Sequence, residues 1–245
     1  MSTSAERRDE LTSVYREARA CTRCPQLAST RTQVVFGAGN ADADLMFVGE
    51  APGAKEDERG IPFVGAAGKL LDELLGEVGL AREDVFITNV LHCRPPGNRD
   101  PLPSEIDNCQ QYLMRKVELI APKVICTLGN FATKLLRGDP TGISRLHGQA
   151  EIIAVGSRAV RLYPLYHPAA ALYTRALLDT LRADVARLPA LLAMESPAQP
   201  EPVAAEPAVP EPEAAAEPRS GAEPQRPDWA IPGDDAPEDR QLGLF

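Results

Sequence analysis

The stretch LMFVGEAPGAKED, residues 45–57, sets the fold class. Its first five residues are apolar and end in glycine, which is the pattern of a short buried strand. Further along, GAAGKLLDELLGEVGL (65–80) carries leucines at helical spacing, and DVFITNV (84–90) is a second apolar run. A strand, a helix and a second strand in that order predict an α/β protein with a largely parallel sheet.

The remaining chain continues this alternation. A charged segment at 5–20 is predicted to be a helix, and an amphipathic helix over 103–122 is expected to start with a Ser104 cap. The other expected elements are a strand over 123–129, a helix over 130–138 closed by Gly138, one or two strands within 150–155 and 158–166, and a final helix over 168–192. We therefore predict a three-layer α/β/α sandwich around a mostly parallel sheet of four to five strands.

The acidic charge of the chain is concentrated in its tail. The chain has 35 acidic and 26 basic side chains, a net charge of −9, but the segment from Glu195 to Arg240 alone holds 12 acids and three bases. The same tail holds 11 of the 23 prolines and few aliphatic residues other than alanine. It cannot bury enough apolar surface to fold. We predict a folded domain over 1–192, a disordered Pro/Ala/Glu linker over 193–240 and a separate terminal peptide over 241–245.

Several classes of protein are excluded at this point. No apolar run approaches the ~18 residues that span a bilayer. The N-terminus is charged and has no apolar segment of the kind found in signal peptides, so we expect a cytoplasmic protein with reduced cysteines. Because the first 194 residues are neutral overall, the low isoelectric point does not argue against a domain that binds nucleic acid.

Four of the five cysteines form a candidate metal site. Cys21 and Cys24 make one C-x-x-C pair, and Cys93 and Cys109 make a wider pair. Four thiolates can hold zinc or an iron–sulfur cluster. The single C-x-x-C pair favours a cluster, although zinc and a metal-free site both stay open. Cys126 lies within an apolar strand and is expected to be a core thiol.

Four motifs in order give the chain a family resemblance. They are VFGAGNADADLMFVGEAPGAKED, GIPFVGAAGKLLDELL, ITNVLHCRPPGNRDPLPSEIDNC and YHPAAAL, and together they resemble the family 4 uracil-DNA glycosylases over about residues 14–192. The resemblance implies the uracil-DNA glycosylase fold, base-excision repair of uracil-containing DNA, and a structural 4Fe-4S cluster on Cys21, Cys24, Cys93 and Cys109. It also implies a monomer associated with the bacterial nucleoid. His92 is expected either to support the cysteine site or to lie exposed.

The chemistry of uracil removal assigns the motif residues. A flipped base needs an aromatic face and a polar group that reads its edge. We expect Phe63 to stack on uracil and Asn89 to read O4 and N3–H, with His167 donating to O2 as negative charge develops on the base. The backbone of Gly49 and Ala51 is expected to shape the pocket. Family 1 enzymes carry an aspartate where this chain has Ala51, so the resemblance points to Glu50 or Glu56 for the acidic role. We favour Glu56 for orienting the water and Glu50 for shaping the pocket and positioning its backbone. Gly53 stands where family 1 enzymes carry the tyrosine that excludes thymine, so this chain must exclude thymine in another way.

Two alternatives of other classes remain. One is a relative that links covalently to DNA through a histidine in an inserted loop, although no such loop lies between Asn89 and Cys109. The other is a non-catalytic, cluster-bearing DNA-binding or polymerase-associated module.

The chain ends in QLGLF, residues Gln241–Phe245, where apolar residues reappear after the linker. This peptide resembles those by which bacterial repair proteins bind the sliding clamp, and it predicts that protein as a partner.

Overall fold

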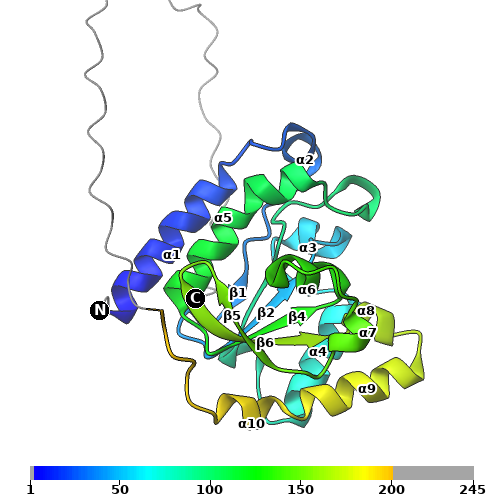
Figure 1. Ribbon diagram of the computed structural model, residues 1–245. Coiled ribbons are helices and arrows are strands. Elements are labelled where there is room, and N and C mark those ends of the chain that lie inside the picture. The colour runs from blue at the N-terminus through cyan, green and yellow to red at the C-terminus, as the bar shows by residue number, and fades with distance from the viewer. Residues whose placement is uncertain (1–2, 201–245) are drawn as a thin grey trace, which may run out of the picture. The chain divides into compact units, whose positions relative to one another are not determined.

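The computed structural model describes residues 3–200 (Figure 1). The terminal peptide at 241–245 and most of the predicted linker lie outside these residues. Within them, none of the helices combines the length and the apolar character needed to cross a membrane.

The centre of the molecule is one six-stranded sheet with the strand order β1-β3-β2-β4-β6-β5. The four inner strands β3, β2, β4 and β6 pair in parallel, and β1 and β5 pair antiparallel at the two edges. The strands are β1 (Ala38–Gly39), β2 (Leu45–Gly49), β3 (Phe86–Asn89), β4 (Val124–Leu128), β5 (Glu151–Val155) and β6 (Arg158–Leu165). The predicted sandwich is confirmed, with six strands in place of the four to five expected. The additional strand is β1, whose two residues leave no periodic signal in the sequence.

Helices cover both faces of the sheet (Figure 1). They are α1 (Ser4–Arg19), α2 (Pro25–Thr30), α3 (Ala54–Arg59), α4 (Ala66–Glu77), α5 (Pro103–Ile120), α6 (Asn130–Arg137), α7 (Ile143–Leu146), α8 (Pro168–Ala171), α9 (Arg175–Val185) and α10 (Leu188–Leu192), with short 3₁₀ turns η1 (Arg82–Asp84) and η2 (Pro96–Asn98). One core lies under α1, α5 and α6, and the other lies under α4, α9 and α10. The short helices α2, α3 and α7 were not predicted from the sequence.

Two sequence expectations about helix ends are wrong. Ser104 does not cap α5, because the helix already begins at Pro103 and Leu102 occupies the cap position. The Leu102 amide instead donates to Glu105 Oε2 at 2.9 Å. The single helix expected over 168–192 is divided into α8, α9 and α10. Thr174 is extended between the first two, and Pro189 lies in the first turn of the third, where its missing N–H costs nothing.

The parallel strands bring four chain segments to one edge of the sheet. Strands β2, β3, β4 and β6 all end there, at Gly49, Asn89, Leu128 and Leu165. In open parallel sheets, ligands bind at this edge, where the loops leave the carboxyl ends of the strands. The segments with unusual chemistry in the sequence are the loops that leave these ends.

Candidate active site and cysteine cavity

A cavity of about 340 Å³ lies at the carboxyl edge of the sheet. It contains every pocket residue that the sequence predicts except Gly49, which lies directly beneath. Its lining consists of Glu50, Ala51, Pro52, Gly53, Glu56, Phe63, Ala67, Asn89, Pro95, Asn98, Arg99, His167 and Ala169. Loops after three different strands therefore meet around one space.

Gly49 brings the two base-reading candidates close to the β2 backbone. A Cβ added to Gly49 would lie 2.3 Å from Asn89 Oδ1 and 2.8 Å from Phe63 Cζ. Asn89 is only 2% exposed and ends β3, so its amide is held by the sheet. The glycine at the end of LMFVG is thus required by close approach rather than by a turn.

Phe63 is held in an unusual backbone conformation. Its φ is +53°, in the left-handed region that an aromatic residue rarely adopts. Arg82 Nη1 donates to the Phe63 carbonyl oxygen at 3.2 Å, and that oxygen also lies against Gly68, where a Cβ would sit 1.7 Å away. Strain of this kind persists only where the surroundings over-determine it, as at binding sites. The Phe63 ring lies against the His167 ring with centroids 5.6 Å apart.

His167 is fixed as a donor that is neutral at physiological pH. Its Nδ1 accepts a hydrogen bond from the Ala169 amide at 3.1 Å, so the ring proton is on Nε2. Burial lowers the pKa of His167 to about 4, against an opposing effect of the Glu56 carboxylate. The side chain can therefore donate from Nε2 without carrying a positive charge.

The two glutamates of the GEAPGAKED loop lie in different environments. Glu56 Oε1 accepts hydrogen bonds from the amides of Val64 and Gly65 at 3.0 and 2.9 Å, which fixes the carboxylate at the N-terminus of α4. The pKa of Glu50 is raised, first by burial and then by the nearby Asp100 carboxylate. Glu56 is thus the more firmly oriented of the two, with Oε2 left for another partner.

Sequence reasoning missed the contribution of the segment that follows Cys93. Pro95, Asn98 and Arg99 line the cavity, and Arg99 is held by a bidentate pair with Glu105 at 2.6 and 2.9 Å. The run PPGNRD marked this segment as a loop, but only the tertiary structure turns it toward the pocket. Sequence reasoning also missed Asp57. This side chain is buried and accepts a hydrogen bond from the Thr32 amide at 3.0 Å, which joins α3 to the segment before β1.

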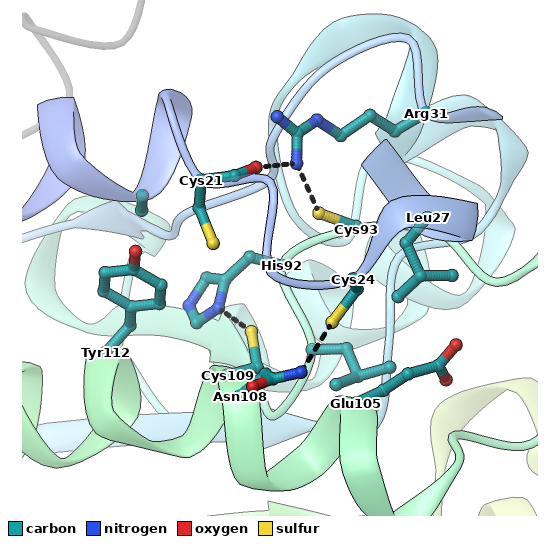
Figure 2. Close-up of a pocket in the computed structure, with 12 residues that line it drawn as sticks. Cys21, Cys24, Leu27, Arg31, His92, Cys93, Glu105, Asn108, Cys109 and Tyr112 are labelled. Atoms are coloured by element: carbon teal, nitrogen blue, oxygen red, sulfur yellow. Dashed lines mark hydrogen bonds between the residues drawn. The ribbon is translucent and has the colours of Figure 1, made fainter. Parts of the chain in front are cut away.

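A second cavity contains the four candidate metal-ligating cysteines. Cys21, Cys24, Cys93 and Cys109 turn their sulfur atoms toward a common space between α1, α2 and α5 (Figure 2). The cavity between them is small, about 20 Å³. Cys126 lies in the core on the other face of the sheet and is fully buried, so its assignment as a core thiol is confirmed.

Each of the four sulfur atoms has a nitrogen partner of its own. Arg23 Nε lies 3.4 Å from Cys21, Asn108 Nδ2 lies 3.6 Å from Cys24, and Arg31 Nη1 lies 3.2 Å from Cys93. His92 Nδ1 lies 2.9 Å from Cys109, and the His92 side chain is buried rather than exposed. Donors of this kind stabilise negative charge on sulfur, as expected of thiolate ligands.

Four thiols are a donor set that an iron–sulfur cluster or a zinc ion takes from proteins. As folded, no group of three or more His, Cys, Asp or Glu side chains within residues 3–200 lies close enough together to hold one metal ion. Burial raises the pKa of Cys109 to about 12, so a positively charged metal centre would favour the thiolate form of this residue.

Comparison with known proteins identifies the family. The family model of the uracil DNA glycosylase superfamily matches residues 36–188. A type-4 uracil-DNA glycosylase of Archaeoglobus fulgidus is 45% identical over 193 residues, which cover 77% of this chain and 96% of the relative. Those of Sulfurisphaera tokodaii and Thermotoga maritima are each 44% identical, over 74% and 69% of this chain and 84% and 86% of their own. The motifs, the parallel sheet and these relatives agree, and the chain belongs to the type-4 uracil-DNA glycosylases, enzymes of DNA repair.

Proposed function

We propose that the cavity at the carboxyl edge binds a flipped uracil and that its side chains divide the work of hydrolysing the N-glycosidic bond. The observation that carries this proposal is the convergence of Asn89, Phe63 and His167, from three separate segments of the chain, on one cavity of about 340 Å³. A base inside a duplex is out of reach, so the enzyme must extrude it into such a pocket.

Asn89 selects the base in this proposal. Its amide donates to uracil O4 and accepts from N3–H, whereas cytosine presents the opposite pattern and would leave buried polar groups unpaired. Phe63 supplies the aromatic face on which the base stacks. The confinement of both side chains against Gly49 supports this assignment, because a reading group must be held more firmly than its ligand.

His167 and Glu56 act on the bond that breaks. As the C1′–N1 bond lengthens, negative charge moves onto uracil O2, and a neutral Nε2–H donor there stabilises the anion. Positive charge develops on the sugar. Glu56 Oε2 faces this charge and orients the water that attacks C1′, while the two amides at Oε1 hold the carboxylate in place. Glu50 shapes the wall beside them.

The product in this proposal is free uracil and an abasic site with the strand intact. Among the described residues that line the cavity there is no lysine to form a Schiff base with the sugar. Incubation with single- and double-stranded oligonucleotides that contain one uracil tests this directly. We expect free uracil without strand cleavage, and no adduct after borohydride. A covalent adduct would favour the histidine-linked relative, and the absence of both products would favour a non-catalytic module.

We propose also that the cysteine cavity holds a 4Fe-4S cluster on Cys21, Cys24, Cys93 and Cys109. The convergence of four thiols, each with its own nitrogen partner, supports this. When bound, such a cluster cross-links the segment before α2 to the start of α5 and the loop after β3. That loop continues into Pro95, Asn98 and Arg99, so the cross-link would steady one wall of the pocket.

The terminal peptide Gln241–Phe245 is proposed to bind the bacterial sliding clamp. Two or three apolar anchors in a preformed groove would suffice for docking, and the linker would keep the enzyme near DNA. Deletion of 241–245 should abolish binding to purified clamp and leave uracil release from a short oligonucleotide unchanged. Binding that survives the deletion would contradict this.

We place the protein, as a monomer, with the chromosome in the bacterial cytoplasm.

A further inference from the structure

Lys116 is a fully buried lysine with no carboxylate partner among residues 3–200. It lies in α5, its exposure is 0%, and burial lowers its pKa to about 7, against an opposing effect of Cys109. Its nitrogen lies 4.5 Å from the centroid of the Phe36 ring and contacts three hydrogen-bonding atoms. These are the Phe36 carbonyl oxygen at 2.6 Å, Thr88 Oγ1 at 2.5 Å and His92 Nε2 at 2.5 Å. Burying a charge without a counter-charge is costly, so its position requires an explanation.

The directions of these hydrogen bonds are determined by the acceptors. A carbonyl oxygen can only accept, and the Thr88 hydroxyl already donates to the Phe36 carbonyl oxygen at 2.9 Å. Both therefore accept from Lys116. In its ammonium form, the form that an anionic neighbour favours, Lys116 has three donors and no acceptor, so its third N–H is directed at His92 Nε2.

The hydrogen bond from Lys116 determines how His92 contacts the cysteine cavity. Once Nε2 accepts from Lys116, the proton of the neutral imidazole must be on Nδ1. Nδ1 lies 2.9 Å from Cys109 Sγ, so His92 donates to that sulfur (Figure 2).

We propose that Lys116 and His92 form a buried hydrogen-bond relay that fixes Cys109 as a cluster ligand, and that Lys116 supplies part of the positive charge that balances the anionic cluster. This inference rests on the proposed 4Fe-4S cluster. Four thiolates outweigh the positive charge of the iron–sulfur core, so the assembly is an anion beside an otherwise uncompensated cation. Lys116 is a positioning residue and does not touch the DNA pocket.

The test compares two Lys→Met variants of the full chain, purified without oxygen. Lys116→Met removes the buried charge and the donor to His92. Lys123→Met is the matched control, because Lys123 pairs with Asp44 at the surface. In the Lys116 variant we expect a lower reduction potential of the cluster and about tenfold faster loss of iron to a chelator, the scale typical of partners of metal ligands. The control should match the wild type.

A second measurement uses the wild-type protein and so does not depend on the variant's folding. The chain has only three histidines. In ¹⁵N-histidine NMR spectra, with His147 assigned by its Gln variant, His92 should carry its proton on Nδ1 and His167 on Nε2. A proton on Nε2 of His92 would overturn the relay.

Failure of the relay and failure of the cluster proposal can be told apart. Iron and sulfide analysis of the wild type decides the cluster, and its absence would overturn both. If the wild type holds the cluster while the folded Lys116 and Lys123 variants share its potential and its rate of iron loss, only the relay is wrong.

Discussion

The two cavities are built on different principles. In the pocket at the sheet edge, protein groups hold one another: two amides fix Glu56, the Ala169 amide fixes His167, and Gly49 packs under Asn89. In the cysteine cavity the four thiols line a small common space, and the buried Lys116 nearby has only neutral hydrogen-bond partners. Protein contacts alone hold the first site, whereas the proposed cluster would complete the second. Substitutions in the pocket should therefore slow the reaction, and those in the cysteine cavity should first reduce the amount of folded protein.

The largest expected effect is that of Cys93→Ala. Loss of one ligand should remove the cluster absorbance and most of the soluble yield together, because the cluster binding energy is part of the folding energy. Cys126→Ser is the matched control on the other face of the sheet and should keep the cluster. Iron content and soluble yield measure both, and a cluster that survives in Cys93→Ala would reassign the fourth ligand.

In the pocket, Glu56→Gln should reduce the single-turnover rate by roughly 10³-fold, within the range for a group that orients an attacking water. Glu50→Gln should cost about tenfold, because that side chain shapes the wall. Both variants keep the size of the side chain and should melt close to the wild type. The reverse order of rates would exchange the two roles.

Gly49→Ala should reduce kcat/KM by about 10²-fold while the protein stays folded. The new methyl group would meet Asn89 Oδ1 and the Phe63 ring, and displacement of a reading group by about 1 Å has effects of this size. Gly76→Ala in α4 is the control, since a Cβ there meets nothing within 4 Å. Equal rates in the two variants would show that close packing under Asn89 is unimportant.

The smallest effect concerns pH. Because His167 titrates near 4 in the folded enzyme, its neutral donor form is kept as pH falls from 7 to 5. The contribution of His167 to kcat/KM should decline only as pH approaches about 4. An inflection near 6.5 in the wild-type profile that is absent from His167→Gln would contradict a neutral, partly buried donor.

The neutral form of His167 also links pH to stability. The pKa of a histidine in the unfolded chain is near 6.5. Protonation therefore favours the unfolded state between about 6.5 and 4, and the contribution of His167 to stability is present above this window and lost as pH falls through it. Unfolding of the wild type in denaturant should thus depend on pH more steeply across this window than that of His167→Gln.

The sheet and most of the pocket could be predicted from the sequence, for physical reasons that particular residues illustrate. Runs such as LMFVG are buried on both sides of the sheet and read directly as strands. Asn89 is the last residue of one such strand, and His167 follows another. The break of the last helix at Thr174 depends on tertiary packing, and no periodicity reports it. Asn98 and Arg99 reach the pocket through a loop whose direction is set by the fold.

At Lys116 the sequence gives a signal of burial, but the role of the side chain can be inferred only from the structure. It stands on the apolar stripe of α5, four residues from both Tyr112 and Ile120, where a lysine is out of place. A buried position could be inferred from that spacing. Its contact with His92, and through it with Cys109, joins segments far apart in the chain and could not be.

The most direct test of the account is the choice between uracil and cytosine by wild type and Asn89→Asp, measured as single-turnover base release from matched oligonucleotides. We expect the wild type to release uracil and leave cytosine. The aspartate should lose roughly 10³-fold or more in uracil release and lose its preference for uracil, because a donor becomes an acceptor. Wild-type rates and selectivity in Asn89→Asp would remove Asn89 from the pocket and contradict the assignment of this cavity as the uracil site.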